Sequence, residues 1–310
     1  MPLQPRFKTY EDGICSLVET DERFIVMTAE NRSAIRSLPG RIGERFIDLG
    51  ICEQTMIGAA AGLALRGRIP VVHALATFLT LRAFEFIRTD VGIAKLPVKL
   101  VGTFTGFASE ANGPTHQALE DIALMRGIPG VNVWCPADEE DLVLGLEAVM
   151  LDPAPCYIRY NACRPSVVHE QPFRMGCAEI LQEGSDLTLL TYGALLGECL
   201  KAAQLLDDAG YSVGLVNMRM LKPADTDTIL ASARGSKLLV TVEDHFKTGG
   251  LYTVVAETLV EHGFASRVLP IALDQRWFKP ALLNDVLAYE GFTGAAIAGR
   301  IKDHLIQTTW

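Results

Sequence analysis

The chain has 310 residues, of which 49% are hydrophobic and 21% charged, and this composition excludes a disordered protein. Its net charge of −9 argues against nucleic acid or an anionic membrane as a partner. The uncharged stretch 69–81 is shorter than the roughly 20 apolar residues that cross a bilayer. The first residues lack the apolar core of an export signal, and the 7 cysteines show no CxxC spacing. We therefore expect a cytoplasmic protein without a disulfide framework or a zinc site.

Short apolar runs alternate with helix-like stretches through the first half of the chain. The runs predict buried strands at 24–28, 46–49, 69–75, 98–103, 131–135 and 156–159. The stretches between them predict helices at 53–66, 80–94, 117–126 and 138–150. Such alternation predicts a largely parallel sheet with helices on both faces.

The pattern is interrupted once and then resumes. Residues 164–178 carry two prolines and no periodicity, which predicts a linker at 166–177. Beyond it, strands are expected at 187–191, 212–216, 237–242 and 267–271. Helices are expected at 196–209, 224–233 and 252–262, with one or two more near the end. The predicted fold class is α/β, with two doubly wound, mostly parallel-sheet domains at 1–165 and 178–310.

Two segments of the first half carry candidate functional side chains. In RFIDLGICEQTMIGAAAGLALRG, residues 45–67, Glu53 opens a helix rich in glycine and alanine. A carboxylate in a first helical turn is also favoured by the helix dipole, so a purely structural role stays open. In HALATFLTLRAFEFIR, residues 73–88, aromatic and basic side chains include Phe78 and Arg82. The alternative for Phe78 is plain core packing, and the alternative for Arg82 is a surface salt bridge.

A third segment places a histidine at the mouth of a helix. The motif GPTHQ puts His116 after a Gly-Pro turn and beyond the carboxyl end of the strand expected at 98–103. Ligands of open α/β sheets bind at that edge. A capping or solvated histidine is the alternative.

Together these segments resemble the pyrimidine-binding domain of the transketolase family of thiamine diphosphate enzymes. The resemblance rests on FIDLGICEQ, ATFLTLRAFEFIR and GPTHQALEDIALMRGIPGVNVWCPAD. In the second half, LLTYGALL, VNMRMLKPAD and LLVTVEDHFKTGGL are similar to the family's C-terminal domain. The sequence lacks the GDG motif with which the family binds the diphosphate. The chain therefore resembles one half of a split transketolase.

The resemblance implies roles for five residues around the cofactor. Glu53 would donate a hydrogen bond to the N1′ ring nitrogen of the aminopyrimidine, and Phe78 would stack on that ring. Leu75 and Arg82 would contact the cofactor. His116 would be an acid–base partner at the hydroxyl group of the reacting two-carbon unit.

The resemblance also points to the substrate side of the site, where the chain departs from the family. Phe104 and Thr105 stand where many family members have a His-Asp pair that lines the sugar channel. Arg159 and Arg164 are the candidates for gripping a sugar phosphate. Because an apolar Phe cannot anchor a phosphate or a hydroxyl, we expect a ketose other than the ordinary pentose phosphates.

The resemblance implies a transferase that moves a two-carbon ketol unit from a ketose donor to an aldehyde acceptor. It would be active only with an N-terminal, GDG-containing partner subunit that holds the diphosphate and Mg²⁺ (or Ca²⁺). We expect this chain to homodimerise through helix 53–66, giving an α₂β₂ heterotetramer.

Two alternatives stay open. One is the β subunit of a 2-oxo acid dehydrogenase or of an acyloin-forming enzyme. The string GPTHQALEDIALMR favours the transketolase reading, because dehydrogenase β chains usually lack it. The other is a non-catalytic α/β scaffold, against which the joint presence of Glu53, Phe78 and His116 argues.

Overall fold

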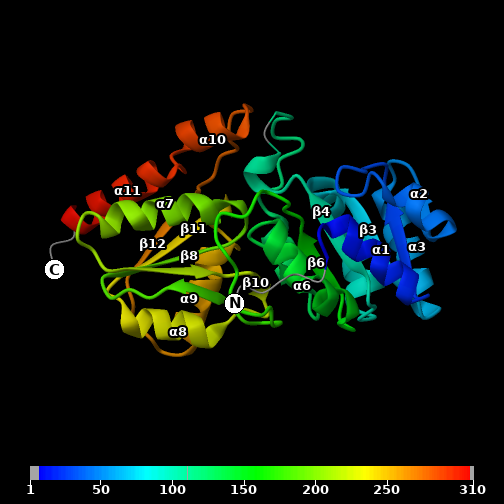
Figure 1. Ribbon diagram of the computed structural model, residues 1–310, viewed down its shortest axis with the longest axis horizontal. Helices are drawn as coiled ribbons and strands as arrows, with labels where there is room; N and C mark the ends of the chain where they lie inside the picture. The colour runs from blue at the N-terminus through cyan, green and yellow to red at the C-terminus, as the bar shows by residue number, and fades with distance from the viewer. Residues whose placement is uncertain (1–6, 110, 308–310) are drawn as a thin grey trace. The chain divides into compact units, whose positions relative to one another are not determined.

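The computed structural model describes residues 7–109 and 111–307, which form two compact units (Figure 1). Unit 1 consists of the chain up to Thr105 together with Asp121–Met175. Unit 2 consists of Gly106–Glu120 together with the chain from Gly176 onward, so the GPTHQ segment belongs to unit 2. Within the described ranges, no helix combines the length and the apolar character needed to cross a membrane.

Unit 1 is built on a parallel sheet. Its strands are β1 (Phe24–Thr28), β2 (Phe46–Asp48), β3 (Ile69–Leu75), β4 (Lys99–Thr103), β5 (Asn132–Trp134) and β6 (Cys156–Arg159). They lie in the order β5-β6-β4-β3-β1-β2, and every pair among them is parallel. Strands β4 and β6 are buried along their whole length, as expected for a sheet covered on both faces.

Helices cover this sheet. They are α1 (Tyr10–Thr20), α2 (Leu38–Ile42), α3 (Glu53–Leu65), α4 (Phe84–Phe86), α5 (Asp121–Arg126), α6 (Glu139–Leu151) and the 3₁₀ turn η1 (Gly43–Arg45). Helix α1 packs with α2 and α6, whereas α3 packs on β3. The segment after β3 contains two π-helical turns, η2 (Phe78–Arg82) and η3 (Ile87–Gly92), which also pack with α3.

Two helices expected from the sequence are wrong in part. The helix expected at 80–94 is replaced by η2, α4 and η3, because Ala83 N donates to Phe78 O and Ile93 N to Arg88 O, each a bond across five residues. The helix expected at 117–126 begins only at Asp121. The residues before it form loops and turns.

The interior of unit 1 contains one titratable side chain of interest. His73 of β3 is fully buried, and its Nε2 lies 2.9 Å from the Tyr10 hydroxyl. Because burial disfavours the charged imidazolium, the pKa of His73 is lowered from its ordinary 6.5 to about 4.

Unit 2 is a second mostly parallel α/β layer structure. Its sheet consists of β7 (Glu179–Gln182), β8 (Leu187–Thr191), β9 (Val213–Asn217), β11 (Leu239–Phe246) and β12 (Val268–Leu273), and the short strand β10 (Met220–Lys222) lies outside this sheet. The order β12-β11-β8-β9-β7 is parallel except for β7, which runs antiparallel to β9. The expected fold class, two mostly parallel sheets flanked by helices, is confirmed.

The helical elements of unit 2 lie on both faces of its sheet. They are α7 (Leu196–Asp207), α8 (Thr226–Gly235), α9 (Leu251–Glu261), α10 (Leu283–Glu290), α11 (Gly294–Gln307) and the 3₁₀ turns η4 (Gly106–Ala108) and η5 (Gly193–Leu195). Helices α7 and α11 pack together on one face, and α8 and α9 on the other (Figure 1).

Candidate functional site

A hollow of about 320 Å³ opens in unit 1 at the carboxyl edge of its sheet. The residues that line it follow β1, β2 and β3, and they are Ala29, Glu30, Asn31, Ile51, Glu53, Leu75 and Phe78. From β1 the chain passes to β2 on one side and then returns to β3 on the other side of β1. The hollow therefore lies where the winding of the sheet reverses, which is where open α/β sheets bind ligands.

Glu53 is the acidic group of the hollow. It is the first residue of α3 and only 2% exposed, where the amide groups of the helix N-terminus favour a carboxylate. Its Oε2 accepts a hydrogen bond of 2.7 Å from Arg82 Nη1. No hydrogen bond to Oε1 is made by the described residues. Since a nearly buried oxygen without a partner is unfavourable, Oε1 is available to a ligand.

Phe78 supplies an aromatic ring beside this carboxylate. It begins η2 directly after β3 and is half-buried. Leu75, the last residue of β3, adds an apolar wall. The Arg82 guanidinium carbon lies 4.2 Å from the centre of the Phe78 ring. The structure thus brings together four residues predicted from the sequence. Glu53, Leu75 and Phe78 line the hollow, whereas Arg82 contacts Glu53 and Phe78 from outside it.

Sequence reasoning missed the three residues that follow β1. Glu30 has a positive φ of 67°, and Asn31 Nδ2 donates to the Thr103 hydroxyl. Ala29, Glu30 and Asn31 all line the hollow. Their position directly after a buried strand was the available signal, because the carboxyl ends of parallel strands share one edge.

The substrate-side candidates of unit 1 have different surroundings. Phe104 is 41% exposed and has a positive φ of 56°, an uncommon conformation for a bulky residue, whereas Thr105 is buried. Arg159 is 3% exposed, and its Nε donates to Asp121 at 3.0 Å, so it is part of a buried ion pair. Arg164 is exposed. Substrate contacts by these residues stay a prediction.

His116 lies in unit 2, in a turn closed by its own amide. Its Nδ1 is 2.9 Å from the Thr115 hydroxyl, which orients the imidazole ring. The next residue, Gln117, is buried and donates from Nε2 to Phe278 O at 2.9 Å, anchoring the segment. Because Glu53 and His116 belong to different units, their meeting in one active site stays a prediction.

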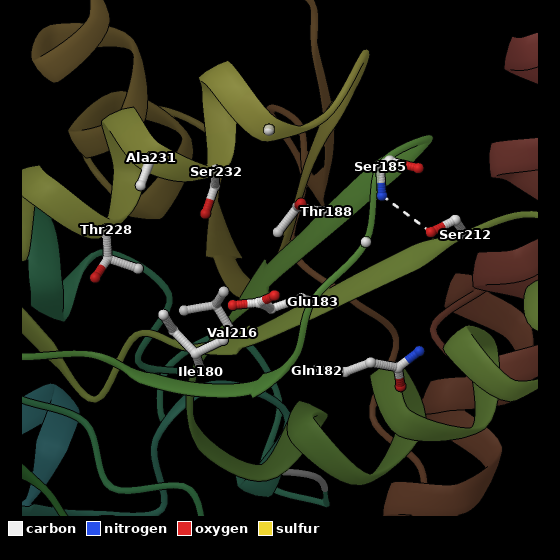
Figure 2. A pocket seen from close by; sticks show the side chains of 12 residues that line it. Ile180, Gln182, Glu183, Ser185, Thr188, Ser212, Val216, Thr228, Ala231 and Ser232 are labelled. Atoms are coloured by element: carbon white, nitrogen blue, oxygen red, sulfur yellow. Dashed lines mark hydrogen bonds between the residues drawn. The ribbon is translucent and has the colours of Figure 1, made fainter.

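Unit 2 contains another hollow, of about 500 Å³, between α8 and the edge of its sheet (Figure 2). Thr188 comes from β8, Val216 from β9, and Thr228 and Ser232 from α8, while Ser185 N donates to the Ser212 hydroxyl at 3.1 Å. None of the sequence-predicted residues lines it within the described chain. It is lined by Ile180, Gln182, Glu183, Gly184, Ser185, Thr188, Ser212, Val216, Thr228, Ala231, Ser232 and Gly235.

Comparison with known families identifies the family to which the chain belongs. Residues 7–163 match the pyrimidine binding domain of transketolase, and residues 176–297 match the transketolase C-terminal domain. The chain belongs to the transketolase family. The resemblance inferred from the sequence motifs is thereby confirmed, and enzymes of this family depend on thiamine diphosphate.

Three individual relatives show how much of a transketolase-family protein this chain represents. It is 36% identical over 310 residues to 1-deoxy-D-xylulose-5-phosphate synthase of Synechococcus sp. (strain JA-2-3B'a(2-13)), covering 97% of this chain and 48% of that protein. The chain thus spans about half the length of that relative. It is 35% identical to a 6-deoxy-6-sulfo-D-fructose transketolase subunit of Clostridium sp. (strain MSTE9), covering 82% and 80%. A solved split gene transketolase, an inactive β4 tetramer, is similar at 30% identity and a TM-score of 0.86, covering 96% and 97%.

Proposed function

We propose that this chain is one subunit of a split, thiamine diphosphate-dependent transketolase of the cytoplasm, which transfers a two-carbon ketol unit from a ketose to an aldehyde. The observation that carries the proposal is the nearly buried Glu53 carboxylate, with Oε1 available, beside the Phe78 ring in the hollow between β1 and β3. The similarity to a transketolase subunit and to a split gene transketolase supports it.

The lining residues fit the aromatic end of the cofactor. When bound, thiamine diphosphate supplies carbanion chemistry, and the protein supplies orientation and electrostatics. Through Oε1, Glu53 would donate a hydrogen bond to the N1′ ring nitrogen of the pyrimidine. Phe78 would offer a flat apolar surface for stacking, and Leu75 would exclude water from one side.

The substrate side is assigned to residues outside this hollow. His116 would be the acid–base partner at the substrate hydroxyl group, with its ring oriented by Thr115. Phe104, with 41% of its surface exposed, offers an apolar contact where the family often has polar groups. This favours a ketose that lacks the usual phosphate or carries another group. A relative whose name specifies 6-deoxy-6-sulfo-D-fructose supports that substrate class.

The anionic end of the cofactor is assigned to a partner chain. A diphosphate with Mg²⁺ (or Ca²⁺) needs oxygen ligands, and this sequence contains no GDG motif to supply them. An N-terminal transketolase subunit would bring that site. Exposed apolar residues near α3 and η3, namely Ile51 (67%), Leu65 (71%) and Ile93 (69%), would be covered by a second copy of this chain. The expected assembly is α₂β₂.

A second candidate is the reaction of 1-deoxy-D-xylulose-5-phosphate synthase, favoured by the 36% identity to an enzyme of that name. The test is to reconstitute the chain with the GDG-containing chain of the same organism, thiamine diphosphate and Mg²⁺, and to analyse the products by mass spectrometry. Transfer of two carbons from a ketose to an aldehyde is expected. Formation of 1-deoxy-D-xylulose 5-phosphate instead would favour the second candidate, and the absence of both products would refute a catalytic role.

A further inference from the structure

Arg82 touches two walls of the unit 1 hollow from outside it. Its Nη1 donates to Glu53 Oε2 at 2.7 Å, and its guanidinium lies 4.2 Å from the centre of the Phe78 ring. Its side chain is 38% exposed, whereas that of Glu53 is 2% exposed. One side chain therefore links the only acidic group at the start of α3 to the aromatic ring that begins η2.

The local backbone explains how one residue reaches both. Phe78 and Arg82 are the first and last residues of η2, where Ala83 N donates to Phe78 O at 3.3 Å across five residues. Such π-helical turns are rare and often occur at functional sites. A guanidinium is planar, so it can donate in its plane to a carboxylate while its face covers an aromatic ring. A lysine at this position could make the ion pair but not the stacked contact.

We propose that Arg82 is a positioning residue, which fixes the Glu53 carboxylate and the Phe78 ring relative to each other so that both meet one aminopyrimidine ring. The inference rests on the proposed function. Arg82 donates to Oε2 of Glu53. Oε1 has no partner among the described residues and would make the hydrogen bond to the ligand. Without Arg82, the carboxyl group loses its anchor and can turn about its last side-chain bond. Ring and carboxyl then no longer share one fixed geometry.

The test is a double-mutant cycle on cofactor affinity. The full chain, reconstituted with its GDG-containing partner, is titrated with thiamine diphosphate and Mg²⁺ by calorimetry. Arg82→Gln is expected to weaken binding about five- to twenty-fold, since the Glu53 and Phe78 side chains, no longer held by Arg82, must then be ordered on binding. Arg82→Lys should fall between Arg82→Gln and the unmodified chain. The exposed Arg88 in the same segment gives the control Arg88→Gln, expected within about twofold of the unmodified chain.

The cycle separates positioning from direct contact and from a structural role. When the chain already carries Glu53→Gln, the fold-loss of cofactor affinity caused by Arg82→Gln should be at least about threefold smaller, because Arg82 acts through Glu53. An equal loss in both backgrounds would overturn the inference, as would no loss at all. The melting temperatures of the variants identify a merely structural role of Arg82. In that case Arg82→Gln would lower the melting temperature, and its effect on cofactor affinity would not depend on the residue at position 53. If Glu53→Gln alone leaves cofactor affinity unchanged, the proposed function itself fails, so the two failures are distinguishable.

Discussion

Replacing Glu53 with Gln tests the proton-donor role assigned to this residue. Gln has the same shape as Glu, so the hollow keeps its volume, but a primary amide is a far weaker acid than a carboxyl group. The bond from Arg82 to a carboxylate becomes a bond to a neutral amide oxygen, and because Glu53 is only 2% exposed this costs about 1–1.5 kcal/mol. That is small beside the roughly 5–15 kcal/mol by which domains are stable. The variant should therefore fold and still assemble.

The expected kinetic effect is much larger than the effect on stability. A positioned proton donor contributes about 10²–10⁴-fold, so removal of the C2 proton of the bound cofactor should slow by at least about 10²-fold. The assay is hydrogen–deuterium exchange at C2, measured by acid quench and NMR in the reconstituted complex. Glu85→Gln, an exposed carboxylate of the same region, is the matched control. Exchange of the Glu53→Gln complex at the unmodified rate would refute the assignment.

Substrate choice, cofactor stacking and the pH dependence of stability can each be tested. In a panel of ketose donors with one aldehyde acceptor, an unphosphorylated or otherwise modified ketose should be the preferred donor, because the exposed Phe104 is apolar. Xylulose 5-phosphate as the best donor, by about tenfold, would contradict this. Phe78→Ala should weaken cofactor binding about three- to tenfold through lost stacking, while Phe86→Ala should not; calorimetry decides. The pKa of His73 is about 4 in the folded chain and near 6.5 when exposed, so the unfolded state binds more protons between these values. The free energy of unfolding should thus fall by up to about 3 kcal/mol as the pH drops from 6.5 to 4, and urea titrations of His73→Gln should lack this loss.

The sheets could be predicted from the sequence because parallel strands buried on both faces are short apolar runs. The expected strands at 24–28, 69–75, 156–159 and 187–191 have the observed bounds. The π-helical turns η2 and η3 could not be predicted, since their apolar residues also fit an ordinary helical period. The bonds across five residues distinguish the two, and both turns pack against α3.

Part of the candidate site could also be predicted from the sequence. Glu53, Leu75 and Phe78 follow strands that end at one sheet edge, so motif and topology agree. The role of Arg82 as a link between Glu53 and Phe78 depends on the π-helical turn and was not visible in the sequence. The contribution of Asn31 was missed because it carries no motif and enters the hollow only through its place after β1.

The central claim is that this chain provides the pyrimidine end of a thiamine diphosphate site and a partner provides the diphosphate end. Calorimetric titration of thiamine diphosphate with Mg²⁺, into this chain alone and into its mixture with the GDG-containing chain, tests it most directly. We expect no micromolar binding by the chain alone, because stacking and one hydrogen bond hardly offset the freedom lost on binding. The mixture should bind the cofactor with micromolar or tighter affinity. Micromolar binding by this chain alone would contradict it.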